Sequence, residues 1–186
     1  MCMKIAVIDF ESRYTKDVLD NLTQLNVEHC LFKYDVEAQD VEEYDAFIFT
    51  GSYDTVYAGG RLPHPSIMEC NKPILGICYG HQIMHYLLGG QVRKSNTPEH
   101  DFVDVNVEDS LLFKNLPKTQ KVKMAHNDEV SELAPGFKCI ASEDNCRYAA
   151  SENVEKKIYT VQFHPEAKGN DYGKEIFMNF LDIVKN

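Results

Sequence analysis

The chain has 186 residues, a formal net charge of −10 and 44% hydrophobic residues. This length suits a single α/β domain over residues 1–186, and the negative charge argues against a surface for nucleic acid or an anionic membrane. No apolar run approaches the ~20 residues of a membrane span and the N-terminal segment lacks a signal-peptide pattern, so we expect a cytoplasmic protein.

The first part of the chain alternates between short apolar strands and amphipathic helices, the pattern of a doubly wound α/β fold. Strands are predicted at Lys4 to Ile8, Val27 to Phe32 and Ala46 to Phe49, and a helix from Ser12 to Leu25. We therefore expect a mostly parallel sheet flanked by helices. Asp9, at the carboxyl end of the first strand, is predicted to cap that helix and to order its loop.

A polar loop with Gly51 and Ser52 follows the third strand. In open parallel sheets the ligand crevice lies at the carboxyl ends of the strands, which places this loop next to the end of the following strand. A plain surface turn is the alternative. A short helix is then predicted around Ser66 to Cys70.

The stretch from Ile74 to Gln82 reads Ile-Leu-Gly-Ile-Cys-Tyr-Gly-His-Gln and predicts a strand, a sharp turn and a helix. Its apolar start suits a strand covered on both faces. The glycines two residues before and after Cys78 allow a side chain at the apex of the turn, as in a nucleophile elbow. A helix N-terminus favours a thiolate over a thiol and can hold an oxyanion. A small buried structural thiol is the alternative.

The second half of the chain is predicted to add shorter, partly antiparallel strands and a closing amphipathic helix from Tyr172 to Val184. We interpret Glu99 to Asp101 as a solvated charged loop, and His126 to Asp128 as part of a loop after Met124. The predicted strands are Gln91 to Arg93, Phe102 to Val107, Lys121 to Met124, Phe137 to Ser142, Arg147 to Ala150 and Ile158 to Phe163.

The last of these strands leads directly into His164-Pro165-Glu166. A histidine and a carboxylate that leave the end of a strand match the needs of a cysteine nucleophile, because the imidazole can take the thiol proton and the carboxylate can orient the imidazole. Together with the elbow they predict a catalytic triad of Cys78, His164 and Glu166.

The cysteines show no Cys-x-x-Cys and no paired histidine spacing, which predicts free thiols and no metal site. The chain also lacks the Gly-x-x-x-x-Gly-Lys-[Ser/Thr] and Ser-Gly-Gly-x-Asp-Ser phosphate-binding patterns, so we expect no nucleotide cofactor in this chain. The six cysteines are Cys2, Cys30, Cys70, Cys78, Cys139 and Cys146.

The Gly-Ile-Cys-Tyr-Gly-His-Gln and Val-Gln-Phe-His-Pro-Glu blocks resemble those of class I (triad-type) glutamine amidotransferases, and the resemblance covers essentially the whole chain. It implies a flavodoxin-like α/β fold with added antiparallel strands, and hydrolysis of L-glutamine to glutamate and ammonia by the triad. It also implies an oxyanion hole made by the loop of Gly51 and Ser52 with Tyr79, and contacts to glutamine from Gln82, His126 and Asn127.

Within that family, Ile8 to Thr15 resembles the Asp-Phe-Gly-Ser-Gln-Tyr-Thr opening of GMP synthetase amidotransferase domains, and Met124 to Val130 resembles their Ser-His-x-Asp-x-Val loop. This implies a free-standing glutaminase subunit that supplies ammonia to a separate ATP-pyrophosphatase (synthetase) subunit, which would use ATP and Mg²⁺ to convert XMP to GMP. Departures at Glu11, Arg13 and Ser52 leave room for another acceptor.

Two other classes of function stay open. A stand-alone hydrolase of γ-glutamyl compounds would share the triad and need no partner. A non-catalytic regulatory protein on the same fold is disfavoured because Cys78, His164 and Glu166 are all present.

Overall fold

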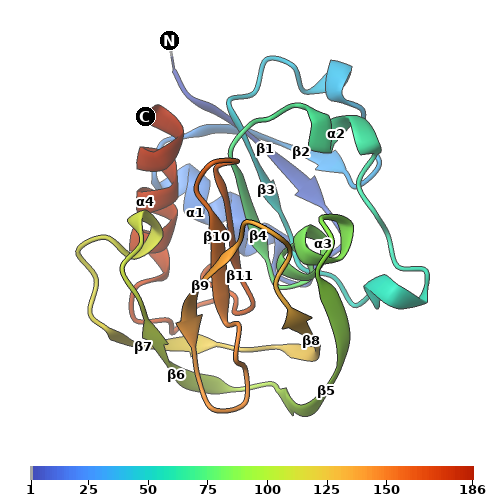
Figure 1. Cartoon of the computed structure of the whole chain (residues 1–186). Coiled ribbons are helices and arrows are strands. Elements are labelled where there is room, and N and C mark those ends of the chain that lie inside the picture. Colours follow the sequence, from blue (N-terminus) through green and yellow to red (C-terminus); the bar gives the residue numbers. More distant parts are fainter. Residues whose placement is uncertain (1) are drawn as a thin grey trace.

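The computed structural model describes residues 2–186 and has a long twisted sheet at its centre (Figure 1). The strands in this part of the chain are β1 (Lys4–Asp9), β2 (Glu28–Lys33), β3 (Ala46–Phe49), β4 (Ile74–Ile77), β5 (Gln91–Glu99), β6 (Phe102–Val107), β7 (Thr119–Lys123), β8 (His126–Glu132), β9 (Lys138–Ser142), β10 (Ala150–Asn153) and β11 (Ile158–Val161). The helices are α1 (Thr15–Gln24), α2 (Pro65–Glu69), α3 (Tyr79–Leu87) and α4 (Gly173–Lys185), with 3₁₀ turns η1 (Ala38–Asp40), η2 (Val56–Ala58) and η3 (Leu111–Phe113).

The sheet is parallel in its first part and antiparallel in its second. Its strand order is β2-β1-β3-β4-β11-β10-β9-β6-β7, and pairing is parallel from β2 through β11 and antiparallel from β11 through β7. Strands β5 and β8 form a separate antiparallel pair. The predicted doubly wound, mostly parallel sheet with added antiparallel strands is confirmed.

Helices cover both faces of the parallel part because its strands are apolar on both faces. Ile5 and Val7 of β1 pack in one core with side chains of α1 and α4, whereas Ala6 and Ile8 pack in a second core with side chains of α2 and α3. This period-two division is the one that a strand imposes on its side chains. The continuous apolar runs in the sequence arise from this double burial.

Asp9 orders the loop after β1 but does not cap the helix, which corrects half of its predicted role. Its Oδ1 accepts hydrogen bonds from the Glu11 N–H and the Thr15 hydroxyl, each at 2.8 Å. The helix begins at Thr15, later than predicted, and its N-cap residue Tyr14 makes no side-chain cap hydrogen bond.

The predictions for the polar segments of the second half were wrong in three places. Glu99 ends strand β5 and is buried, rather than lying in a solvated loop, and His126 begins strand β8. The strand predicted from Arg147 forms later, as β10. Two of the inward-facing side chains of β8 are polar, so the sequence does not show the apolar–polar alternation that is typical of a strand. These side chains are stabilised by partners that are remote in sequence.

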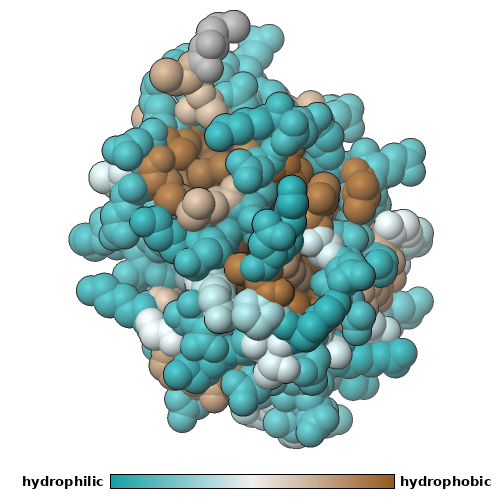
Figure 2. All heavy atoms as spheres, turned by 90° about the vertical axis from the view of Figure 1, so that its left-hand side faces the viewer, coloured by the Kyte–Doolittle hydropathy of each residue, from teal (hydrophilic) through white to brown (hydrophobic). Residues whose placement is uncertain are grey.

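Much of the surface is polar, with hydrophobic side chains between the polar ones (Figure 2). Figure 2 shows hydrophobic side chains gathered on the face that carries α4, and a shallow groove there is lined by Met3, Leu25, Val27, Met178 and Leu181. Among residues 2–186, no helix combines the length and the apolar character needed to cross a membrane. All six cysteines are free, as predicted.

The turn between β4 and α3 is held by close backbone contacts at its two glycines. A Cβ on Gly76 would lie 2.7 Å from the carbonyl oxygen of Gly80, and a Cβ on Gly80 would lie 2.7 Å from the carbonyl oxygen of Phe49 in β3. Neither glycine is among the residues with positive φ. The glycines are therefore needed for space, and they let α3 start directly against the sheet.

We expect the substitution Gly80→Ala to lower the free energy of unfolding by about 2 kcal/mol, because the added methyl group meets rigid strand backbone. Urea denaturation measures the loss. The control is Gly59→Ala, where a Cβ meets nothing within 4 Å and the positive φ alone costs about 1 kcal/mol. A Gly80→Ala protein as stable as the wild type would contradict this account of the turn.

Candidate functional site

Cys78 occupies the apex of the turn between β4 and α3, in a strained backbone conformation. Its φ and ψ are 53° and −102°, and its N–H donates to the carbonyl oxygen of Val161 at 2.7 Å. The side chain is buried, and its sulfur stands at the N-terminus of α3, where the first backbone N–H groups have no partner within the helix. These donors, with the helix dipole, favour negative charge at the sulfur.

His164 and Glu166 reach the same place from β11. Strands β4 and β11 pair in parallel with Ile77 opposite Val161, so the residues that follow both strands leave the same edge of the sheet. His164 Nδ1 lies 2.7 Å from Glu166 Oε1, and both side chains are buried. The carboxylate fixes the proton on Nδ1, which leaves Nε2 for proton transfer.

The electrostatics of this pair favour the imidazolium. Burial by itself would lower the pKa of His164, but the negative charges of Glu166 and Cys78 outweigh burial and hold that pKa well above its ordinary value. The second carboxylate oxygen of Glu166 is buried without a hydrogen-bond partner among the described residues. The charge of Glu166 is therefore directed at His164.

Gly51 lies next to both Cys78 and His164. A Cβ at this position would lie 3.0 Å from His164 Cε1 and 3.5 Å from Cys78 Cβ. The next residue, Ser52, lines the pocket beside Cys78, and its hydroxyl accepts from the Asp54 N–H at 3.1 Å. Ser52 is not among the residues with positive φ, so this loop does not require a second glycine.

A pocket of about 230 Å³ opens at Cys78. Its walls come from the loop after β1, the loop after β3, the start of α3, the start of β8 and the end of β11. Its lining residues are Ser12, Arg13, Tyr14, Ser52, Tyr53, Asp54, Thr55, Cys78, Tyr79, Gln82, His100, Ala125, His126, Asn127, Asp128 and His164. The structure thus brings the predicted site residues from the elbow, the His-Pro-Glu segment and the segment after Met124 to one place.

Gln82 connects three walls of this pocket. Its amide nitrogen lies 3.0 Å from the carbonyl oxygen of Asp128 and 3.2 Å from Gln162 Oε1. The Gln162 amide in turn donates to Cys78 Sγ at 3.5 Å. Gln162 was not predicted as a site residue, although its place two residues before His164 at the end of a buried strand was a usable signal.

His126 and Asn127 lie at the pocket wall in different ways. Both ring nitrogens of His126 have partners within the protein: Nδ1 lies 2.9 Å from the Asp128 carbonyl oxygen and Nε2 lies 3.1 Å from Glu99 Oε2. The side chain of Asn127 is exposed and accepts from His100 Nε2 at 2.9 Å. A direct contact of either residue with an amino-acid substrate stays a prediction.

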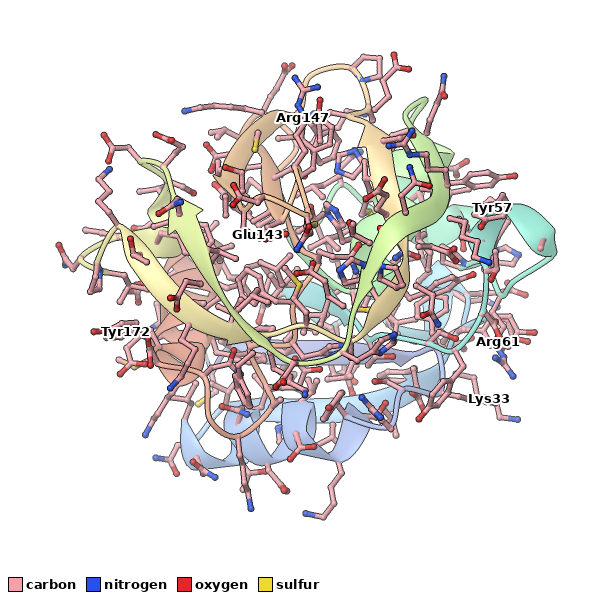
Figure 3. The ribbon with its side chains drawn as sticks, turned by 90° about the horizontal axis from the view of Figure 1, so that it is seen from below. Lys33, Tyr57, Arg61, Glu143, Arg147 and Tyr172 are labelled. Carbon is pink, nitrogen blue, oxygen red and sulfur yellow. The ribbon has the colours of Figure 1, made fainter. Side chains whose placement is uncertain are left out.

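The pocket mouth is braced by the segment that contains η2. The Tyr57 hydroxyl donates to Asp128 Oδ1 at 2.8 Å, and Arg61 pairs with Glu11 at 2.7 Å and with Asp54 at 2.9 Å. Tyr57 and Arg61 come from the same side of the molecule in Figure 3. Glu11, a departure from the glycine of the resembled motif, keeps a left-handed backbone with a φ of 64°.

Comparisons with known proteins agree on the family. Residues 6–184 match the protein-family model described as glutamine amidotransferase class-I. The chain is 36% identical over 180 residues to the GMP synthase (glutamine-hydrolyzing) of Macrococcus caseolyticus, and 38% identical over 182 residues to that of Lactobacillus acidophilus. Each match covers 95% of this chain and 35% of the relative, so the chain spans about a third of these proteins.

Solved structures give the same result at the level of the fold. A Thermoplasma acidophilum protein described as a GMP synthase subunit superposes with a TM-score of 0.90 at 29% identity, and the match covers 100% of this chain and 95% of that one. A glutamine amidotransferase from Thermotoga maritima superposes with a TM-score of 0.78 at 18% identity, over 100% of this chain and 83% of that one. The chain belongs to the class I glutamine amidotransferase family.

Proposed function

We propose that this chain hydrolyses L-glutamine through a triad of Cys78, His164 and Glu166, and that it supplies the ammonia to a separate synthetase subunit that converts XMP to GMP. The observation that carries the proposal is the position of His164, whose Nδ1 is held by Glu166 at 2.7 Å and whose pKa is raised in part by the Cys78 sulfur. A base oriented by a carboxylate and close to a thiol at a helix N-terminus is the arrangement that cysteine nucleophiles need.

Catalysis begins when the Cys78 thiolate attacks the side-chain amide carbon of glutamine. The carbonyl oxygen becomes an oxyanion, which backbone N–H groups of Ser52 and Tyr79 would hold. His164 protonates the amide nitrogen, the C–N bond breaks, and ammonia leaves behind a thioester on Cys78. His164 then takes a proton from water, the resulting hydroxide attacks the thioester, and glutamate departs as the thiolate is restored.

The size and the lining of the pocket favour a single amino acid as substrate. Its volume of about 230 Å³ is below the range of typical drug-sized sites. Gln82 and the segment at Asn127 and Asp128 offer the polar groups that would hold the α-amino and carboxylate groups. This supports glutamine over larger γ-glutamyl peptides.

The assignment to GMP synthesis is supported by the relatives named as GMP synthases and by the match of this chain to about a third of their length. The partner subunit would carry out the conversion of XMP to GMP: it would bind ATP and Mg²⁺ and receive the ammonia. No phosphate-binding loop pattern in this chain could take over that part.

We expect Cys78→Ala to reduce ammonia release from glutamine by about four orders of magnitude or more, because no other group in the pocket can form the thioester. Ammonia release is measured with a coupled assay, and circular dichroism and urea denaturation check that the fold is unchanged. The matched control is Cys139→Ala, a half-buried cysteine on β9 away from the pocket, which should keep full activity. Turnover retained in Cys78→Ala would overturn the triad.

We expect Glu166→Gln to lower kcat/KM by about 100-fold and to move the alkaline limb of its pH profile towards lower pH. Glu166 raises the pKa of His164, so removing its charge lowers that pKa, and the imidazolium that protonates the leaving amide nitrogen is lost earlier as the pH rises. The measurement is kcat/KM across the pH range in which the fold is intact. An alkaline limb in the same position as in the wild type would show that Glu166 does not set the charge state of His164.

We expect glutamate formation from glutamine to be slow for the chain alone and to rise when an ATP-pyrophosphatase subunit, XMP, ATP and Mg²⁺ are added, with GMP formed in an amount equal to the glutamate. The test compares the full mixture with mixtures that lack one component. Strong activity that is indifferent to these additions would keep glutamine hydrolysis and remove the GMP assignment. Strong activity on γ-glutamyl peptides would favour a stand-alone hydrolase.

A further inference from the structure

A group of ligand-type side chains lies buried behind the wall that β8 contributes to the pocket. Glu99, His126 and Cys146 each place one ligand atom within 4.8 Å of the others, and all three residues are buried. They come from the end of β5, the start of β8 and the loop between β9 and β10. None of them belongs to the proposed triad.

The histidine is in the tautomer that a metal ligand requires. His126 Nδ1 lies 2.9 Å from the carbonyl oxygen of Asp128, and a carbonyl can only accept, so Nδ1 carries the proton. The lone pair of Nε2 therefore points into the cluster, where Glu99 Oε2 lies 3.1 Å away. A ring nitrogen fixed by a backbone carbonyl is the usual support of a metal-binding histidine.

Each of the two carboxyl groups near the cluster has one buried oxygen without a hydrogen-bond partner among the described residues. The Glu99 side chain is 7% exposed, and its Oε1 has no hydrogen-bond partner among the described residues. Glu143, close enough to interact with Glu99, also has a buried oxygen without a partner. Among residues 2–186, neither carboxylate forms an ion pair with a lysine or an arginine. A bound cation would interact with these oxygens and compensate the charge of the buried carboxylates.

Two residues of one loop contrast in their placement. In Figure 3, Glu143 lies inside the curve of the ribbon formed by β5 and β6, whereas Arg147 lies at the outer edge of the molecule. Cys146, between them in sequence, is 2% exposed. The loop between β9 and β10 thus directs Arg147 to the surface and places Glu143 and Cys146 at the cluster.

We propose that Glu99, His126 and Cys146, with Glu143 as a fourth ligand, bind a zinc ion. Thiolate, imidazole and carboxylate together are ligands of zinc, whereas calcium and magnesium prefer oxygen alone. Tetrahedral zinc places its ligand atoms about 3.5 Å apart. Glu99 Oε2 and His126 Nε2, 3.1 Å apart, already lie at about this spacing, and the Cys146 sulfur, which is within 4.8 Å of them, would approach by about 1 Å on binding. The protons of the Cys146 thiol and of the Glu99–His126 pair are released to solvent as the metal enters.

The bound metal would fix the pocket wall without touching the substrate. His126 donates to the Asp128 carbonyl oxygen, and the Gln82 amide donates to the same oxygen. A metal on His126 Nε2 thereby sets the position of Asp128 relative to α3. The proposal does not rest on glutamine hydrolysis, and its test does not use activity.

The test is a titration with Co²⁺, which reports thiolate ligation by its absorption. The parent is the Cys78→Ala chain, dialysed against a chelator, so that the reactive thiol is absent. One equivalent of Co²⁺ should give a thiolate-to-metal charge-transfer band in the near ultraviolet and the visible bands of a tetrahedral site. Cys146→Ser in this background should lose the charge-transfer band, and the matched control Cys139→Ser should keep it.

A second variant covers the case in which Cys146→Ser does not fold. Glu99→Gln should keep the charge-transfer band but weaken the affinity for Co²⁺ by 10-fold or more, and Zn²⁺ should raise the thermal midpoint of the parent by about 5 °C but not that of the variant. Three results would overturn the proposal: no bands with the parent, bands unchanged in a folded Cys146→Ser protein, or an affinity unchanged in Glu99→Gln.

Discussion

Parallel pairing between β4 and β11 is the constraint on which the site depends. The two strands are remote in sequence, yet the register that places Ile77 opposite Val161 delivers Cys78 and His164 to one edge of the sheet. The hydrogen bond from the Cys78 N–H to the Val161 carbonyl oxygen, at 2.7 Å, joins the turn itself to the neighbouring strand. A slip of one residue would turn the side chains of a strand to the opposite face and separate His164 from Cys78.

The sequence alone was sufficient to predict the parallel part of the sheet and the position of the candidate site. Strands β3 and β4 are short continuous apolar runs, and each is followed by a segment that contains a glycine, Gly51 or Gly80, so both the strands and the site at their ends could be recognised locally. The start of α1 could not be recognised, because no side chain caps its first turn and Asp9 instead accepts a hydrogen bond within the loop. The roles of Gly76 and Gly80 were also hidden, since the close contacts involve backbone atoms that meet only in the folded turn.

The region around β8 was hidden for a different reason. Its inward positions include His126 and Asp128, which look like loop residues until their partners are known. Those partners, Glu99 and Tyr57, are remote in the chain and meet β8 only in the folded protein. The same reason applies to Cys146, because ligands from three separate segments leave no spacing pattern in the sequence. Buried polar groups are satisfied by tertiary partners, and a single sequence does not reveal these.

The left-handed backbone at Cys78 has a consequence for how such a chain can change. A residue other than glycine at a φ of 53° costs about 1–2 kcal/mol, so glycine would relax the turn while removing the thiol. Stability and reactivity therefore oppose each other at this position. Under selection for heat resistance alone the elbow would drift towards glycine, and the thiol that the proposed reaction requires would be lost.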